Sequence, residues 1–263
     1  MIDTHCHLTS KVFRGRETEV VDAAAAAGVS RMISIAVGSG DAKAALALAE
    51  ADPRVFCSAG VHPLHSDEAI DWDDLRRVGT SPRCVAWGEL GLDRHYTRPD
   101  PDTQRRVLDA QLEHIVAWTA EGLGKSVVVH SRKAVAELLP ILDASGLPPE
   151  RFVFHCFTEG PEDAQRVLDF GAWISFTGVL TFANAPEVAE SARLVPIERV
   201  MVETDSPYLS PEPHRKVRPN EPRYVVAVAE RLAEIHGLTP PELEARLDAN
   251  AERFFGLPSD GHA

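Results

Sequence analysis

Cysteine is scarce in this chain of 263 residues: it occurs four times, and no two copies form a CxxC pair. Disulfide frameworks and thiolate zinc sites rely on closely spaced cysteines, so both are disfavoured here. Three of the four lie in apolar, strand-like runs. We therefore expect buried free thiols in a reducing compartment: Cys6, Cys57, Cys84 and Cys156.

Long hydrophobic runs and positive charge are also in short supply. No apolar stretch approaches the roughly 18 residues of a membrane span, and the polar, histidine-containing start is unlike a signal peptide. These absences predict a cytoplasmic protein with no membrane partner.

Lys and Arg number 27 against 40 Asp and Glu, a formal net charge of −13. That balance argues against broad nucleic-acid binding through a basic face, but it is compatible with a small positive pocket on an acidic body.

The sequence instead offers a regular alternation of short apolar runs and amphipathic helical segments. Glycines stand where helix C-termini are expected, at Gly28, Gly122 and Gly146. Eight β-branched runs are expected to form strands: Ile2–Cys6, Arg31–Val37, Arg54–Gly60, Cys84–Leu90, Ser126–His130, Arg151–Cys156, Ala172–Phe176 and Arg199–Asp205.

Near-continuous apolar strands that alternate with helices predict a parallel α/β sheet. Eight such units in about 250 residues predict a (β/α)8 TIM barrel of the metal-dependent hydrolase type. We expect it to form a single domain over residues 1–257, followed by a short tail at 258–263. An open, doubly wound sheet is the alternative, but its glycine fingerprint is missing after the first strand, where HCHLTS stands instead.

Metal-ligating side chains stand at the carboxyl ends of the predicted strands, where barrel enzymes place their chemistry. A strand turns residues two apart to the same face, so His5 and His7 should point the same way. Taken singly, each such residue is more often a core histidine, an ion-pair partner or a turn cap. Together they form a set of nitrogen and oxygen donors suited to divalent metals: His5, His7, Glu89, His130, His155 and Asp205.

Six ligands are more than one tetrahedral site accepts. A carboxylate that bridges two ions would use them all, so the set predicts two divalent ions roughly 3.5–4 Å apart with a bridging water. Zn, Mg, Mn and Ni remain open as the metal. A bridging hydroxide would be the nucleophile, and a carboxylate that touches metal and water can hold that nucleophile and accept its proton. Asp205 is the candidate for this role.

The sequence resembles the TatD family of metal-dependent hydrolases from end to end. The motifs that carry the resemblance are DTHCHL, GVHP, WGELGLD, VVHSRKA, HCFTEG and VETDSPYLSPEPHR…NEP, in this order. The resemblance implies a metal-dependent (β/α)8 barrel with two divalent metals and deoxyribonuclease activity, often exonucleolytic. One departure is KVRP before NEP, where the family usually has a short glycine-containing stretch.

The resemblance also implies how the ligands divide between the ions. The first metal would be held by His5, His7, Glu89 and Asp205. The second would be held by Glu89, His130 and His155, so that Glu89 bridges the two. Glu89 and Asp205 are then the expected catalytic residues.

Phosphate needs cationic partners, and a nucleobase can stack on an aromatic ring. Tyr208 is the candidate for stacking. For each cation, an ion pair with the acidic body is an equal alternative. The candidates for phosphate are His62, Arg94, Arg132 and Arg215, with Lys216 and Arg218 nearby in the sequence.

These features predict a 3′–5′ exonuclease that prefers single-stranded or frayed DNA, and one complete site per chain is compatible with a monomer. Two alternatives stay open. An amidohydrolase, lactonase or phosphotriesterase-like enzyme of the same barrel class often bridges its metals with a carbamylated lysine on the fourth strand, where this chain has Glu89. A non-catalytic scaffold on the same fold is disfavoured by the intact ligand set.

Overall fold

The structure is a computed structural model that describes residues 1–258. It contains eight strands, which follow one another in chain order in one eight-stranded sheet. Their bounds are β1 (Ile2–Cys6), β2 (Arg31–Ser34), β3 (Val55–Ala59), β4 (Cys84–Asp93), β5 (Ser126–Arg132), β6 (Phe152–Phe154), β7 (Trp173–Phe176) and β8 (Val200–Val202).

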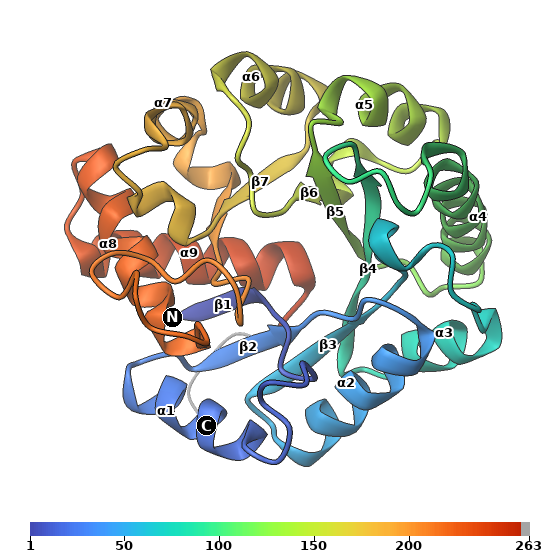
Figure 1. Cartoon of the computed structure of the whole chain (residues 1–263), viewed down its shortest axis with the longest axis horizontal. Helices are drawn as coiled ribbons and strands as arrows, with labels where there is room; N and C mark the ends of the chain where they lie inside the picture. The colour runs from blue at the N-terminus through green and yellow to red at the C-terminus, as the bar shows by residue number, and fades with distance from the viewer. Residues whose placement is uncertain (259–263) are drawn as a thin grey trace. The chain divides into compact units, whose positions relative to one another are not determined.

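Helices separate the strands and two more follow the last one (Figure 1). This succession makes the fold a (β/α)8 TIM barrel, as expected. The helices are α1 (Glu17–Ala26), α2 (Ser39–Ala51), α3 (Trp72–Gly79), α4 (Pro101–Ala120), α5 (Val135–Ala144), α6 (Pro161–Phe170), α7 (Pro186–Leu194), α8 (Val225–His236) and α9 (Pro240–Phe255). No helix within residues 1–258 is both long and apolar enough to cross a membrane.

The chain divides into two compact units. Unit 1 comprises residues 1–33, 156–165 and 174 onward, and unit 2 comprises residues 34–155 and 166–173. The expectation of a single domain over 1–257 stays a prediction. Of the tail expected at 258–263, only residue 258 belongs to the described part of the chain.

Unit 1 is organised around β1, β7 and β8. Strands β7 and β8 are parallel, with Ile174 opposite Val200, and α9 packs against both β1 and β8. Helix α9 begins with a capping box in which Thr239 and Glu242 satisfy each other's backbone N–H groups. This local signal explains why the helix starts where it does.

Unit 2 is organised around the parallel strands β3 to β6. Every residue of β4 is buried, because α3 and α4 cover it; Figure 1 shows α4 running alongside β4. The side chain of Asp100 caps α4 by accepting a hydrogen bond from the N–H of Thr103 at 3.0 Å. The core of this unit includes Trp87, whose ring centroid lies 4.7 Å from that of Trp118.

Strand ends differ from expectation in ways that matter for the site. β4 and β5 run further than predicted, because their pairing continues to Asp93 opposite Arg132. β6 and β8 are shorter, so His155 and Asp205 lie just after their strands.

The glycines expected at helix ends have positive φ angles, which confirms this role. The φ angle is +91° at Gly28, +92° at Gly122 and +72° at Gly146.

The cysteines largely follow expectation. Cys6, Cys57 and Cys84 are buried free thiols. The expected burial of Cys156 is wrong: it is half-buried, because it lies beyond the end of β6 rather than inside the strand.

Gly91 allows the backbone of β4 to lie close to that of β5. Its φ angle is +145°, and a Cβ atom at this position would lie 2.0 Å from the carbonyl oxygen of His130. Gly91 and His130 are paired across the two strands. A side chain at residue 91 would therefore push the backbone of His130 away.

We expect Gly91→Ala to lower the free energy of unfolding by about 3 kcal/mol or more, because backbone strain is added to a clash. Gly122→Ala is the matched control: its φ angle is +92°, but nothing lies within 4 Å of the added Cβ. It should cost only about 1 kcal/mol of strain. Urea unfolding of both variants measures the difference. An equal loss of free energy of unfolding in both would contradict the prediction, because the backbone of His130 would then accommodate the added Cβ without cost.

Candidate metal centres

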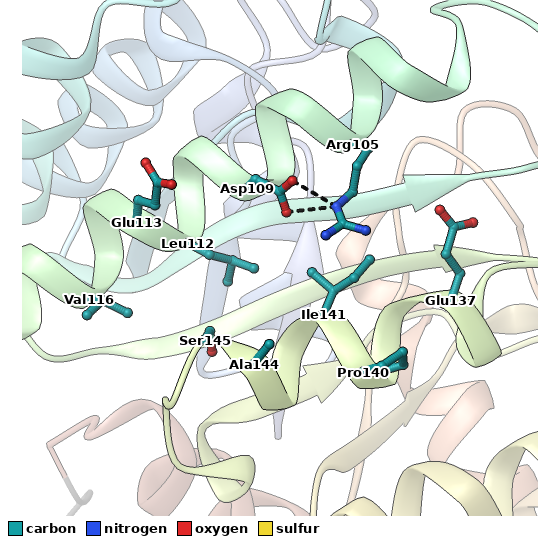
Figure 2. A pocket seen from close by; sticks show the side chains of 10 residues that line it. All are labelled: Arg105, Asp109, Leu112, Glu113, Val116, Glu137, Pro140, Ile141, Ala144 and Ser145. Atoms are coloured by element: carbon teal, nitrogen blue, oxygen red, sulfur yellow. Dashed lines mark hydrogen bonds and ion pairs between the residues drawn. The ribbon is translucent and has the colours of Figure 1, made fainter.

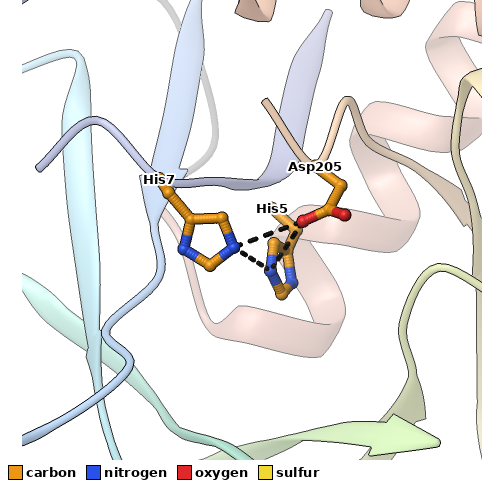
Figure 3. Close-up of side chains that lie close together, drawn as sticks. All are labelled: His5, His7 and Asp205. Carbon is orange, nitrogen blue, oxygen red and sulfur yellow. Dashed lines mark hydrogen bonds and ion pairs between the residues drawn. The ribbon is translucent and has the colours of Figure 1, made fainter. Parts of the chain in front are cut away.

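The first ligand group lies in unit 1 and consists of His5, His7 and Asp205 (Figure 3). His5 belongs to β1, His7 follows it, and Asp205 follows β8. Backbone hydrogen bonds hold these segments together: Asp205 N–H donates to the carbonyl of His5 at 2.9 Å, and His7 N–H donates to that of Ser206 at 2.8 Å. The side chains of His5 and His7 extend to the same side, as their spacing predicts, and their rings meet edge to face at 79°.

The donor atoms of the unit 1 ligand group converge. The Nε2 atoms of His5 and His7 are 3.3 Å apart, and Oδ1 of Asp205 lies 3.6 Å and 3.2 Å from them. Two imidazole nitrogens that face each other need a proton or a cation between their lone pairs, and a carboxylate favours either. The donor set therefore fits a divalent metal ion.

A buried carboxylate supports this group from behind. Asp3 is fully buried and accepts hydrogen bonds from His5 N–H at 3.3 Å and from the N–H and hydroxyl of Thr204 at 3.0 and 2.6 Å. Burial raises the pKa of Asp3 to about 8, against the opposing effect of the hydrogen bonds from Thr204 and His5. Asp3 thus connects β1 to the segment that carries Asp205.

A second buried carboxylate fixes the same segment. Glu203 accepts hydrogen bonds from the N–H of Cys156 at 2.7 Å and from the hydroxyl of Ser175 at 2.6 Å. Sequence reasoning left both Asp3 and Glu203 out of the candidate set. The signal that could have found them is an acidic residue inside or directly after an apolar strand, where burial demands hydrogen-bond partners.

The second ligand group lies in unit 2 and consists of Glu89, His130 and His155. Glu89 is 1% exposed. Its Oε1 lies 2.6 Å from Nε2 of His155 and 2.9 Å from Nδ1 of His130. These residues come from β4, from β5 and from the residue after β6, so three neighbouring strand ends build the group. Burial of a carboxylate among imidazoles requires a compensating positive charge.

His62 joins this group, although it was expected to contact substrate. Its Nε2 lies 3.4 Å from Oε1 of Glu89 and 3.2 Å from Nδ1 of His130. Its Nδ1 accepts a hydrogen bond from Leu64 N–H at 2.9 Å. Neutral His62 therefore carries its proton on Nε2, toward the group. The ligand atoms of His62, Glu89 and His130 all lie within 4.8 Å of one another, so these three residues could also hold a metal ion.

His130 has the opposite arrangement. Its Nε2 lies 3.3 Å from Oδ2 of Asp93, whose other oxygen accepts hydrogen bonds from the N–H groups of His95 and Tyr96 at 2.8 and 3.0 Å. Because Asp93 accepts a hydrogen bond from Nε2–H, the neutral ring of His130 carries its proton on Nε2. The lone pair on Nδ1 is then directed at Glu89. Metal-binding histidines are commonly oriented by such a carboxylate. Sequence reasoning did not assign Asp93 this role.

The pKa shifts of His130 and Asp93 have their cause in the same contacts. Burial acts to lower the pKa of His130, but hydrogen bonds to Asp93 and Glu89 outweigh it and raise that pKa above its ordinary value. Burial acts to raise the pKa of Asp93, but hydrogen bonds from His130 and from the backbone of Tyr96 and His95 outweigh it and lower that pKa to about 2. The ligand group thus attracts positive charge, which a proton or a metal ion can supply.

The expected substrate-binding residues fall into two classes. Arg94 is held by Glu137 through separations of 2.8 and 2.5 Å, so its charge is already balanced. Arg132 and Arg215 contact aromatic rings instead, at 5.3 Å from Tyr96 and 3.7 Å from Phe182. Within residues 1–258, no carboxylate forms an ion pair with either of them.

Tyr208 is 59% exposed, and its ring centroid lies 6.3 Å from that of His7. This position next to the unit 1 ligand group is compatible with stacking on a base. Substrate roles for Tyr208, His62 and the arginines stay predictions.

A pocket of unit 2 lies apart from the ligand group, between α4 and α5 (Figure 2). Its wall is formed by apolar side chains such as Leu112 and Ile141. At its edge, Nε of Arg105 lies 2.8 Å from both carboxylate oxygens of Asp109. Its lining contains no residue of either ligand group.

The sequence matches the family described as TatD related DNase over residues 2–256. The chain belongs to this family. It is 39% identical over 261 residues to the uncharacterized metal-dependent hydrolase YcfH of Escherichia coli K12, covering 98% of this chain and 96% of YcfH. It is 35% identical over 265 residues to the 3′-5′ ssDNA/RNA exonuclease TatD of Citrobacter rodentium, covering 98% of each.

Among solved structures, the chain is similar to YJJV, a TatD homolog from Escherichia coli K12. The TM-score is 0.89 at 28% identity, and the match covers 98% of both chains. Membership of the TatD family and its barrel fold are thereby confirmed. The assignment of single residues to metal or substrate is not tested by these similarities and stays a prediction.

The raised pKa of Asp3 predicts how stability depends on pH when no metal is bound. Its pKa of about 8 in the folded state lies above the ordinary value of 3.8, so the folded state binds this proton more tightly. The contribution of Asp3 to stability is fully present below pH 3.8 and is lost as the pH rises through 8.

We expect the free energy of unfolding of chelator-treated protein to fall, relative to Asp3→Asn, as the pH is raised from about 4 to 8. Urea unfolding at several pH values measures the difference. Asp143→Asn, at an exposed position, is the control and should track the wild type. A constant difference between wild type and Asp3→Asn over this range would contradict the prediction.

Proposed function

We propose that this chain is a metal-dependent phosphodiester hydrolase, a deoxyribonuclease with 3′–5′ exonuclease preference for single-stranded or frayed DNA. The observation that carries the proposal is the unit 2 ligand group, in which a buried carboxylate oxygen lies within 2.6–2.9 Å of two imidazole nitrogens. Two imidazoles beside one buried carboxylate need a positive charge between them, and a divalent ion can supply it to the whole group. A relative named as a 3′-5′ exonuclease supports the nuclease class.

Each unit is proposed to hold one divalent ion. His5, His7 and Asp205 would hold the ion of unit 1, and the unit 2 ligand group would hold the other. Zn, Mg, Mn and Ni are compatible with these nitrogen and oxygen donors. When bound, such ions lower the pKa of a coordinated water and neutralise charge on phosphoryl oxygens. The bridging of both ions by Glu89 stays a prediction.

The chain's own residues would then perform three tasks. Asp205, a carboxylate of the unit 1 ligand group, can accept the proton of the attacking water. His62, whose Nε2 faces the unit 2 ligand group, is proposed to donate a hydrogen bond to a phosphoryl oxygen bound at that group. The balanced charge of Arg94 makes it a weaker partner for phosphate than Arg132 and Arg215, which have no carboxylate partner within residues 1–258.

The alternatives have less support. No lysine occurs in β4, so the carbamylated-lysine bridge of many amidohydrolases and phosphotriesterases has no counterpart there. A non-catalytic scaffold would not need two converging ligand groups. A cytoplasmic location and a monomeric state belong to the same proposal and rest on the sequence.

Metal stoichiometry tests the ligand assignment without reference to activity. We expect chelator-treated protein, titrated with Mn²⁺ or Zn²⁺ in a calorimeter, to bind two ions per chain. His7→Ala and His130→Ala should each lose one strong site, because each removes one donor from a different group. The control is His65→Ala, since His65 pairs with the exposed Glu68 instead. Two sites retained in both ligand variants would contradict the assignment.

The activity is tested with an end-labelled single-stranded DNA oligonucleotide, incubated with Mg²⁺, Mn²⁺ or Zn²⁺ after chelation. We expect a ladder that grows from the 3′ end. Glu89→Gln should slow it by about 10²–10³-fold, because the carboxylate charge is lost while the shape is kept. Glu68→Gln is the control. Absence of cleavage with every metal would refute the nuclease, and faster cleavage of closed circular duplex would refute the preference for single strands.

A further inference from the structure

An exposed aromatic side chain stands next to the unit 2 ligand group. Tyr96 follows β4 and is 50% exposed, so burial does not explain its place. Its N–H donates to Oδ1 of Asp93 at 3.0 Å, and Oδ2 of Asp93 lies 3.3 Å from Nε2 of His130. One carboxylate therefore positions both the metal-ligand candidate and the start of the loop that presents the ring.

The guanidinium of Arg132 lies beside this ring. The Cζ atom of Arg132 is 5.3 Å from the centroid of Tyr96, and no carboxylate within residues 1–258 forms an ion pair with it. Arg94, two residues before Tyr96, is instead neutralised by Glu137. In a chain with 40 acidic and 27 basic residues, an arginine that keeps an aromatic neighbour rather than a carboxylate is available to bind an anion.

We propose that Tyr96 and Arg132 form a nucleotide-binding subsite, in which a base stacks on Tyr96 and the adjoining phosphate binds Arg132. The proposal rests on the proposed nuclease function and names the form of its substrate. Base–aromatic stacking tolerates any base, because every base has a π face, and a guanidinium matches phosphate with two parallel hydrogen bonds. The contact between ring and guanidinium holds both groups in place before the substrate arrives.

The subsite has a consequence for the choice of substrate. A base in a duplex is already stacked and paired, so only a single strand or a frayed end can offer a face to Tyr96. The subsite contributes to binding and not to the chemical step, since neither side chain belongs to a ligand group. Its loss should therefore raise KM and leave kcat unchanged.

The test compares Tyr96→Ala and Tyr96→Phe on two labelled single-stranded oligonucleotides of equal length. One is normal, and the other carries abasic nucleotides over its last positions at the 3′ end. Tyr96→Ala should raise KM for the normal strand about 10-fold, the range expected for one stacked base. It should leave KM for the abasic strand unchanged, and Tyr96→Phe should behave as wild type on both. A rise of equal size on both strands, or no rise on either, overturns the proposal.

The phosphate contact has its own readout. Arg132→Gln should reduce the dependence of log Kd on log salt by about 0.7, the slope lost with one phosphate contact to a single strand. Arg106→Gln removes an exposed arginine of α4 that donates to the hydroxyl of Thr103, and it should leave the slope unchanged. Equal slopes for Arg132→Gln and wild type would overturn the assignment of Arg132.

Fluorescence anisotropy of a labelled 15-mer supplies these Kd values with the full chain and without any cleavage. It also separates the two proposals. Weaker binding by Tyr96→Ala with no cleavage by wild type would uphold the subsite and refute the nuclease. Cleavage by wild type, with Tyr96→Ala unchanged in both binding and KM, would uphold the nuclease and refute the subsite.

Discussion

The buried carboxylate of Glu89 is the constraint on which the unit 2 site depends. Removing an ionised carboxylate from water is costly unless a positive charge compensates it. Glu89 meets two imidazoles at close range, with His155 at 2.6 Å and His130 at 2.9 Å. An imidazole supplies that charge only when protonated, whereas a divalent ion supplies it while keeping the imidazoles neutral as ligands. The proposed metal-bound state would satisfy Glu89 in the second way.

Environment separates the carboxylates of the two units by role. Asp3 is buried beside Thr204, and burial raises its pKa to about 8, which suits a residue that holds strands together. Asp93 is also buried, but hydrogen bonds from His130 and from two backbone N–H groups lower its pKa to about 2. It remains a charged partner for His130. An aspartate side chain thus supports the fold in unit 1, as Asp3, and orients the metal-ligand candidate His130 in unit 2, as Asp93.

The acidic composition of the chain is compatible with a polyanionic substrate because charge is distributed locally. Some arginines form ion pairs with carboxylates, which neutralise their charge: Arg94 pairs with Glu137 and Arg31 with Glu252. Arg132 and Arg215 rest against aromatic rings instead. The proposed preference for a strand end over a long duplex agrees with an acidic chain that would repel duplex and keeps a few arginines for phosphate.

The sequence by itself determined the succession of strands and helices and the identity of the metal-ligand candidates. Both are written in short-range patterns: apolar runs, helix-ending glycines such as Gly28, and polar residues directly after strands. Tertiary structure decided the partners. Only the register of β4 against β5 places Gly91 at the backbone of His130 and extends both strands to Asp93 and Arg132. Whether an arginine is neutralised, or a ring such as Tyr96 gains a guanidinium neighbour, depends on contacts between residues far apart in the chain, which no local pattern encodes.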